Sequence, residues 1–363
     1  PLAPAGNTAD ERLRLFYVAM TRAKRQLIIR YSERSDANKV TLPADFLLAT
    51  NLTTTTAPEP EKVDEIAIAE LAWYQPFVEP TQDLKTLLAP QLEKFKLSAT
   101  SLNSFLDVTR GGPQHFLLNN ILHFPKSKPA AAAYGTAIHW TLQQAHLHVA
   151  STGQQKPLED TLYDFEVAMG RERLAPQDLQ RYLQQGSEHL PVFLSSNALP
   201  MTPTQKAEVG FNYQDVRVEE ARLTGSLDMI DIDKKEKTII VTDYKTGRPA
   251  TAWDKGDEHT KMKLHTYRQQ LLFYKILAEN SSEYHNFTVT KGCLAFIEPT
   301  KAGETSVLEL EFSNLSEELE RTRRLIEAVW RHIITLDLPD TSHYTQDLKG
   351  VLAFEQDLID GIV

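Results

Sequence analysis

The most restrictive feature of this sequence is the stretch LTGSLDMIDIDKKEKTIIVTDYKTG. Two runs rich in Ile, Val and Thr flank the polar loop KKEK, which is the pattern of an antiparallel hairpin. If Asp233 pairs with Thr238 across this loop, Asp228 lies directly opposite Asp243. Strand alternation puts Lys245 on the same face as Asp243. We therefore expect one face of the hairpin to carry two carboxylates and an ammonium group.

This group of charges suits phosphodiester hydrolysis. Opposed residues in an antiparallel pair have Cβ atoms about 4.5–5.5 Å apart, and like charges in that position are destabilising unless something compensates them. A divalent cation between the carboxylates is a natural compensation, and bound Mg²⁺ or Mn²⁺ polarises a phosphate and acidifies a water molecule. The lysine would position that water or stabilise the developing charge. The alternative is a solvent-exposed hairpin with scattered charges, which a short motif alone does not exclude.

Two further motifs flank the hairpin. Upstream, GTAIHWTLQ places Gly135 and His139 four residues apart, and downstream QLLFY does the same for Gln270 and Tyr274. Residues four apart share a helix face, so the glycine permits close approach where the imidazole reaches a metal. An amide and a phenol are well suited to hydrogen bonding. A histidine or tyrosine on an amphipathic helix also serves as an ordinary packing residue, and the residues alone leave both explanations open.

Taken in order, these motifs resemble the RecB-type branch of the PD-(D/E)xK nuclease superfamily, which reads G-x-x-x-H, G-x-x-D, D-Y-K-T and Q-x-x-x-Y. Gly225 and Asp228 supply the second motif and Asp243 to Gly247 the third. The resemblance implies an α/β fold of the restriction-endonuclease type, in which helices flank a mixed central sheet. The resemblance also implies that Asp228, Asp243 and His139 bind the metal, and that these three residues together with Lys245 are catalytic. It further implies that Gln270 and Tyr274 support the lysine and touch the DNA backbone.

Several nearby residues stay outside the predicted site. Glu208 begins a predicted strand at a position where the family often carries an acid, but we do not include it, and Asp231 faces the opposite side of its strand from Asp228. Cys293 is the only cysteine, which excludes an internal disulfide or a centre built from several thiolates. Some relatives hold an iron–sulfur cluster with four cysteines, so we expect no cluster here.

The N-terminal segment ERLRLFYVAMTRAKRQLII resembles the last motif of superfamily 1 DNA helicases of the UvrD/PcrA/Rep branch. The resemblance implies that Arg22 reaches the γ-phosphate of ATP, as an arginine finger does. The alternative is an ordinary helix end, where Arg22, Lys24 and Arg25 complement the helix dipole. The phosphate-binding pattern GxxxxGK[ST] does not occur in the sequence, so we expect ATP to be bound only by the longer parent protein.

Composition shifts predict three parts: a motor remnant at 1–50, a linker with connecting helices at 51–95, and the nuclease domain at 96–363. Periodicity predicts helices at 8–24, 43–49, 65–95, 98–105, 131–150, 158–169, 176–194, 264–279 and 316–335, and strands at 26–30, 208–213, 223–233, 238–244, 286–297 and 306–312. After 335 the pattern becomes less regular. The chain starts with proline, and a helical pattern of apolar residues begins soon after it, so we expect a piece of a longer protein.

Charge and hydropathy limit the possible partners. The net charge of −10 argues against a uniformly basic nucleic-acid surface, although a metal ion or a local basic channel still holds a phosphate in an acidic protein. No run approaches the roughly 18 apolar residues of a membrane span, and the first residues lack signal-peptide features. We expect a cytoplasmic protein with no membrane partner.

The leading hypothesis is a metal-dependent nuclease that acts on single-stranded DNA. It would form the C-terminal part of an ATP-dependent 3′-to-5′ helicase-nuclease of DNA repair and recombination, with DNA and the rest of the motor as partners. The alternative is a catalytically inactive, nuclease-like module that binds DNA or docks a protein. The sequence leaves open exonuclease or endonuclease action, cutting polarity, sequence specificity, partner subunits and oligomeric state.

Overall fold

A computed structural model describes residues 8–34, 39–44, 47, 55–56, 84–196 and 198–363. The chain divides into two units, Pro4–Asp83 and Leu84–Val363, the second together with Pro1–Ala3. Most of the predicted helix at 43–49, the linker and the connecting helices up to residue 83 lie outside the described residues. The boundary at residue 84 falls within the stretch predicted to join the two domains.

In the N-terminal unit, helix α1 (Thr8–Thr21) ends three residues earlier than its periodicity predicts. The prediction of a strand at 26–30 is wrong, because these residues have no strand geometry. In the described part of the unit the β-pairing is a single isolated bridge between Arg34 and Val40. A strand needs a hydrogen-bonded neighbour, so the apolar run at 26–30 remains irregular.

The larger unit is built around a five-stranded mixed sheet in the order β1-β4-β5-β6-β7. The strands are β1 (Gln205–Gly210), β4 (Ser226–Asp233), β5 (Thr238–Lys245), β6 (Thr288–Phe296) and β7 (Ser306–Glu311). Neighbouring strands are antiparallel except β5 and β6, which are parallel. Asp233 pairs with Thr238, which confirms the predicted hairpin register.

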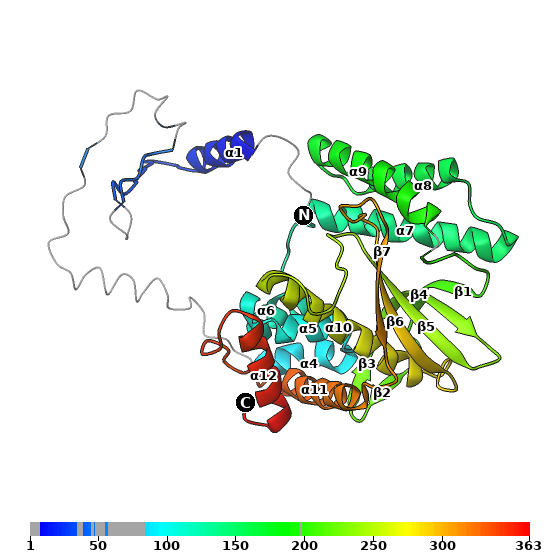
Figure 1. The fold of residues 1–363 in the computed structure, drawn as a ribbon. Coiled ribbons are helices and arrows are strands. Elements are labelled where there is room, and N and C mark those ends of the chain that lie inside the picture. The colour runs from blue at the N-terminus through cyan, green and yellow to red at the C-terminus, as the bar shows by residue number, and fades with distance from the viewer. Residues whose placement is uncertain (1–7, 35–38, 45–46, 48–54, 57–83, 197) are drawn as a thin grey trace. The chain divides into compact units, whose positions relative to one another are not determined.

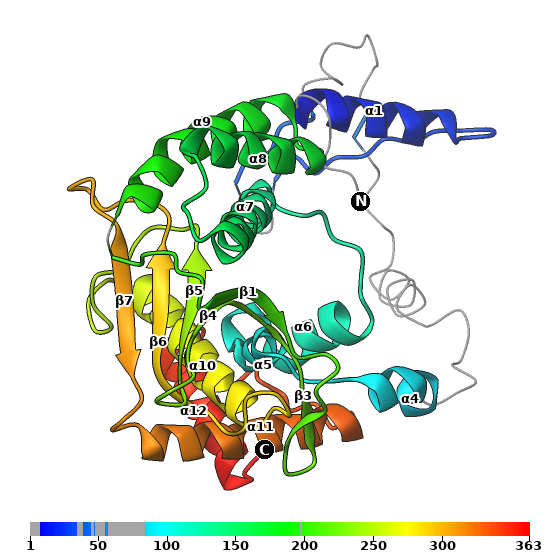
Figure 2. The same cartoon turned by 90° about the vertical axis from the view of Figure 1, so that its right-hand side faces the viewer.

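Helices cover both faces of this sheet, as Figures 1 and 2 show. On one face, α7 (Ala130–Thr152), α8 (Leu158–Arg171) and α9 (Pro176–Ser195) pack against Met229 and Tyr244. On the other face, α10 (Glu258–Glu279), α11 (Ser316–Thr335) and α12 (Leu348–Asp360) share a core with Ile230 and Val241. The expected α/β arrangement of helices around a mixed sheet is therefore present.

Shorter helices precede these elements and pack against α10, α11 and α12. They are α4 (Leu84–Lys94), α5 (Ala99–Leu106), the 3₁₀ turn η1 (Val108–Arg110), α6 (Gly112–Phe116) and the π-helical turn η2 (Leu117–Ile121). Ser98 caps α5 by accepting a hydrogen bond from the backbone N–H of Ser101, as the serine at this position predicts.

Several features of the larger unit differ from the sequence predictions. The predicted strand at 223–233 is broken, because its first part pairs in a separate hairpin of β2 (Val216–Val218) and β3 (Ala221–Leu223). Helix α10 begins at Glu258, six residues early, because the side chain of Asp257 caps it. Helix α12 occupies the tail predicted to be less regular, where it buries Val351, Phe354 and Leu358 on one side.

Candidate active site and metal centre

Three carboxylates form a row across neighbouring strands at one end of the sheet. Glu208 of β1 and Asp228 of β4 occupy opposed positions, since the pairs on both sides of them are in register. Asp243 of β5 takes the next position beyond the pair Met229–Thr242, opposite Asp228. Glu208 has a φ of 52°, a left-handed backbone that is uncommon for a non-glycine residue and clusters at functional sites.

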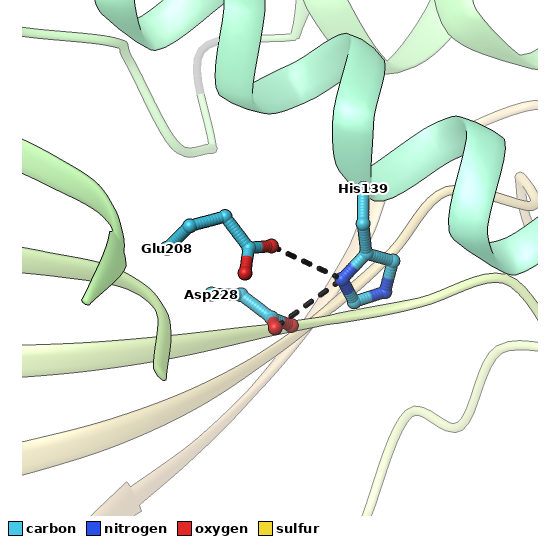
Figure 3. A group of neighbouring side chains, drawn as sticks. All are labelled: His139, Glu208 and Asp228. Atoms are coloured by element: carbon cyan, nitrogen blue, oxygen red, sulfur yellow. Dashed lines mark ion pairs between the residues drawn. The ribbon is translucent and has the colours of Figure 1, made fainter. Parts of the chain in front are cut away.

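His139 reaches this row from helix α7 (Figure 3). Its Nδ1 lies 3.2 Å from Oδ1 of Asp228 and 3.9 Å from Oε1 of Glu208, and its Nε2 lies 3.1 Å from the backbone oxygen of Tyr244. Burial disfavours the charged imidazole, but the hydrogen bond and charge of Asp228 outweigh this effect, so the pKa of His139 is raised. A backbone carbonyl that fixes one ring nitrogen leaves the other for a ligand, which is the usual arrangement at metal-binding histidines.

The carboxylates are held at defined orientations by the chain itself. The backbone N–H of Tyr244 donates to Oδ2 of Asp228 at 2.7 Å, so Oδ1 is the oxygen that faces His139. The hydroxyl of Ser226 donates to Oε2 of Glu208 at 3.3 Å. Burial, followed by the charge of Asp228, raises the pKa of Glu208. Keeping Glu208 ionised beside Asp228 is therefore unfavourable unless a cation lies nearby.

Asp243 is tied to Lys245 and to helix α10. Lys245 Nζ lies 2.6 Å from Asp243 Oδ2 and donates to Oε1 of Gln270 at 2.8 Å. Gln270 Nε2 in turn donates to Asp243 Oδ1 at 2.9 Å, and the hydroxyl of Tyr274 donates to the same oxygen at 3.3 Å. Burial raises the pKa of Asp243 although Lys245 opposes the shift. The amide of Gln270 therefore connects the buried acid with the lysine.

A second aromatic residue of α10 also contacts the lysine. The ammonium of Lys245 lies 4.3 Å from the ring centroid of Tyr267, and that of Lys263 lies 5.4 Å from the same ring. These distances are within the range of cation–π attraction. Sequence reasoning missed Tyr267, although its spacing of three residues from Gln270 puts both on one helix face.

Of the two motif glycines, one allows unusually close packing near the site. A methyl group on Gly225 would lie 3.0 Å from a Cδ atom of Leu277 in α10, so this side chain would have to move by a few tenths of an ångström. A methyl group on Gly135 would lie 3.4 Å from Oγ1 of Thr246, just after β5. Gly225 therefore allows a close approach between the residue before β4 and α10, whereas Gly135 lies at an ordinary contact distance.

The donor set fits a hard divalent cation. One ligand atom each from His139, Glu208 and Asp228 lies within 4.8 Å of the others. Ligands on opposite sides of Mg²⁺, at bonds of 2.0–2.1 Å, are about 4 Å apart, so a small contraction would close this group on an ion. Sequence analysis left Glu208 out; its position at the start of a predicted strand before a candidate acid was the available signal.

The remaining predicted residues lie as follows. Asp231 accepts hydrogen bonds from Oγ1 of Thr204 at 2.8 Å and from Nε2 of Gln205 at 3.4 Å, away from the row of acids, in agreement with its exclusion. Arg22 lies in the N-terminal unit, directly after α1, and is exposed.

Within the described part of the chain, the helices lack the combination of length and apolar character required to span a bilayer.

Comparison with known families gives one match. A family model described as the PD-(D/E)XK nuclease superfamily aligns with residues 96–344, which is more than half of the chain and contains all of the site residues of the larger unit. No curated protein matches the chain.

Proposed function

Because the chain belongs to the PD-(D/E)XK nuclease superfamily, we propose that its larger unit hydrolyses phosphodiester bonds in DNA at a divalent metal centre. The observation that carries this proposal is the row of Glu208, Asp228 and Asp243, with His139 at one end and Lys245 at the other. Three opposed acids are retained in a folded protein when a cation offsets their repulsion.

We assign metal binding to His139, Glu208, Asp228 and Asp243, and Mg²⁺ or Mn²⁺ as the ion. When bound, the ion polarises the phosphate and acidifies a water molecule. The chain's part is to hold the ligands: backbone N–H of Tyr244 fixes Asp228, and the carbonyl of the same residue fixes the ring of His139. Such outer contacts orient metal ligands and tune their affinity.

Lys245 is the proposed catalytic cation. Its ammonium is held by Gln270 and Tyr267, so it stays near the reacting phosphate, where it orients the attacking water and stabilises developing charge. Tyr274 is 6% exposed and its hydroxyl donates to Asp243, which favours support of the site over direct contact with DNA. Gln270 is half-buried and links Asp243 to the lysine, so it has the same supporting role.

For the N-terminal unit we propose the closing segment of a superfamily 1 helicase motor, with Arg22 directed to the γ-phosphate of ATP in the complete motor. Apolar side chains of this unit are exposed: Leu15 is 72%, Tyr17 63% and Ile28 61% exposed. Large exposed apolar side chains on one short segment are expected where another part of a protein covers it. The parent protein would then be a cytoplasmic 3′-to-5′ helicase-nuclease of DNA repair and recombination.

The test is cleavage of end-labelled single-stranded and duplex DNA by the purified chain with Mg²⁺, with Mn²⁺ and with EDTA. We expect metal-dependent cleavage, faster on single strands, that Asp228→Asn abolishes. The competing function is a module that binds DNA without cutting it. Metal-independent binding with no cleavage in either ion would favour that module and reject the nuclease.

A further inference from the structure

A basic cavity lies beside the start of β4, outside the site described above. Its volume is about 640 Å³, and it lies between α4, η2 and the turns that follow β1 and β3. Its polar lining is made of these seven residues: Gln91, Lys94, Lys96, Asn120, His123, Asn212 and Thr224. No lining residue is acidic, although the chain carries a net charge of −10. The cavity is therefore a local region suited to an anion.

Some of these groups build the wall and others are available to a ligand. Lys96 Nζ donates to the backbone oxygen of Asn212 at 2.6 Å, and Oγ1 of Thr224 donates to the side-chain oxygen of Asn212. Within the described residues, the side chains of Lys94 and His123 make no hydrogen bond or ion pair. The fixed groups thus shape the cavity, while an ammonium and an imidazole remain free to contact a bound anion.

The backbone around the cavity is irregular. Asn120 belongs to the π-helical turn η2, and His123 has a φ of 49°. π-Helical turns and left-handed non-glycine residues are energetically unfavourable and are concentrated at functional sites. Both irregularities fall on the same wall of the cavity.

The cavity continues the strand ladder that carries the metal centre. Asn212 lies four residues after Glu208, and Thr224 lies four residues before Asp228. The pairing of β1 with β4 keeps the same register up to the backbone hydrogen bond between Phe211 and Gly225, next to these two residues. At about 3.3 Å per residue, this separation is roughly 13 Å. A nucleic-acid strand with its reacting phosphate at the acids would reach the cavity a few nucleotides along.

Two exposed aromatic side chains flank the cavity in sequence. Tyr213 follows Asn212 and is 101% exposed, and Phe124 follows His123 and is 58% exposed. The segment that carries His123 and Phe124 then runs to the start of α7, the helix of His139 (Figure 2). Basic grooves with exposed aromatic rings are the usual means of holding single-stranded nucleic acid, because unpaired bases stack on the rings.

We propose that this cavity is a phosphate subsite for single-stranded DNA, in which Lys94 and His123 bind the backbone and Tyr213 and Phe124 stack against bases. This inference rests on the proposed nuclease function and specifies its substrate: an unpaired strand led along the β1–β4 ladder to the metal centre. Duplex DNA keeps its bases stacked on each other and gains little from the two aromatic rings.

Binding is tested first, in EDTA so that no strand is cut. Fluorescence anisotropy with labelled oligothymidine compares wild type with Lys94→Glu, and with Lys235→Glu in the β4–β5 loop as a control of equal charge change. We expect roughly tenfold weaker binding for Lys94→Glu and a salt slope reduced by about 0.7, as for one phosphate contact on a single strand. Equal affinity and slope for the two variants would overturn the subsite.

Stacking is tested by Tyr213→Ala with Phe124→Ala in the same assay. We expect a loss of about tenfold or more on the oligothymidine, since each stacked base contributes on the order of 1–3 kcal/mol. A duplex of the same length should bind the variant and the wild type equally. An equal loss on both substrates would contradict the assignment to an unpaired strand.

Cleavage separates this inference from the proposed function. The diester bis(p-nitrophenyl) phosphate is too small to reach from the acids to the cavity, so Lys94→Glu should hydrolyse it at the wild-type rate while KM for the oligonucleotide rises about tenfold. Loss of both activities in Lys94→Glu, with folding intact by circular dichroism, would contradict a separate subsite. A wild type that cleaves neither substrate would reject the nuclease, yet the anisotropy result would still decide whether the cavity binds DNA.

Discussion

Lys245 Nζ lies 2.6 Å from Oδ2 of Asp243, and this ion pair is almost fully buried, with exposed side-chain fractions of 15% and 4%. In the protein without an ion, the lysine therefore compensates the charge of the acid that a metal would otherwise compensate. The amide of Gln270 holds both partners at once, donating to Asp243 and accepting from Lys245. The same two residues that are proposed for catalysis thus stabilise each other before substrate binds.

Lys245→Ala should separate metal binding from chemistry. The lysine is a cation and does not bind the metal, so we expect Mn²⁺ affinity to stay unchanged or improve slightly. Cleavage should fall on the order of 10²–10³-fold, the usual cost of one well-placed electrostatic group. Single-turnover cleavage with a parallel Mn²⁺ titration measures both quantities.

Its matched control is Lys245→Arg, which keeps the charge but replaces a compact ammonium with a planar fork, so rescue should be incomplete. A metal site that disappears in Lys245→Ala, or cleavage that does not fall, would remove the lysine from the proposed mechanism.

Asp243→Ala should abolish cleavage. From the sequence alone, removing one of two opposed carboxylates is expected to leave the fold intact and to stabilise the metal-free protein. The ion pair with Lys245 reverses the second expectation, because alanine leaves a buried ammonium without its carboxylate. Breaking a buried pair costs about 3 kcal/mol, which urea unfolding in EDTA would detect.

Asp243→Asn is the companion variant, since its amide oxygen still accepts from Gln270 and Tyr274. It should lose activity as completely as alanine while losing less stability. Wild-type cleavage by either variant in Mn²⁺ would show that the reaction takes place elsewhere.

Glu208→Gln should weaken the metal site while leaving the apo fold in place. The acid stands opposite Asp228 and its Oε1 lies 3.9 Å from His139, so its removal takes away one proposed ligand and one of three neighbouring negative charges. We expect weaker Mn²⁺ binding by about tenfold or more and an unchanged or higher midpoint of urea unfolding in EDTA. Isothermal titration with Mn²⁺ decides the case: an unchanged Kd would exclude Glu208 from the ligands.

The hairpin and the facing of its acids could be predicted because both depend on residues close in sequence. Alternating apolar positions and the loop KKEK define the register, and Asp233 does pair with Thr238. Glu208 could not be assigned in the same way. Its place beside Asp228 depends on the pairing of β1 with β4 and on a left-handed backbone at that residue, neither of which a local pattern contains.

The contacts by which Lys245 and Gln270 compensate the charge of Asp243 could not be predicted from the sequence either. Strand alternation puts the acid and the lysine on one face, but only the packing of α10 against that face brings the amide between them. The short strands β2 and β3 have three residues each, too few for a periodic signal. Helix α12, in contrast, had a signal in Asp347 at its N-terminus, where the carboxylate accepts from the N–H of Gly350.

The purified chain should have no DNA-stimulated ATPase activity. The sequence has no GxxxxGK[ST] segment, so Arg22 has no nucleotide phosphate to contact in this chain. Phosphate release with and without single-stranded DNA measures this directly, and Arg22→Ala should match the wild type. Turnover well above the blank would contradict the assignment of the N-terminal unit as the end of a motor.

The stability of the larger unit should fall between pH 7 and pH 5 because of His146. Burial lowers the pKa of this histidine to about 4, against an ordinary value of 6.5, and one of its ring nitrogens faces the hydroxyl of Tyr244 at 2.7 Å. The folded protein then binds fewer protons than the unfolded chain between these two pKa values, so stability is present above pH 6.5 and is lost as the pH falls towards 4. At about 1.4 kcal/mol per pH unit, the loss of stability by pH 5 is about 2 kcal/mol.

Urea unfolding of wild type and His146→Gln at both pH values isolates this contribution, since glutamine does not titrate and the acids of the metal centre are common to both proteins. The variant should lose about 2 kcal/mol less than the wild type between the two pH values, and an identical loss would show that His146 is not buried in its neutral form.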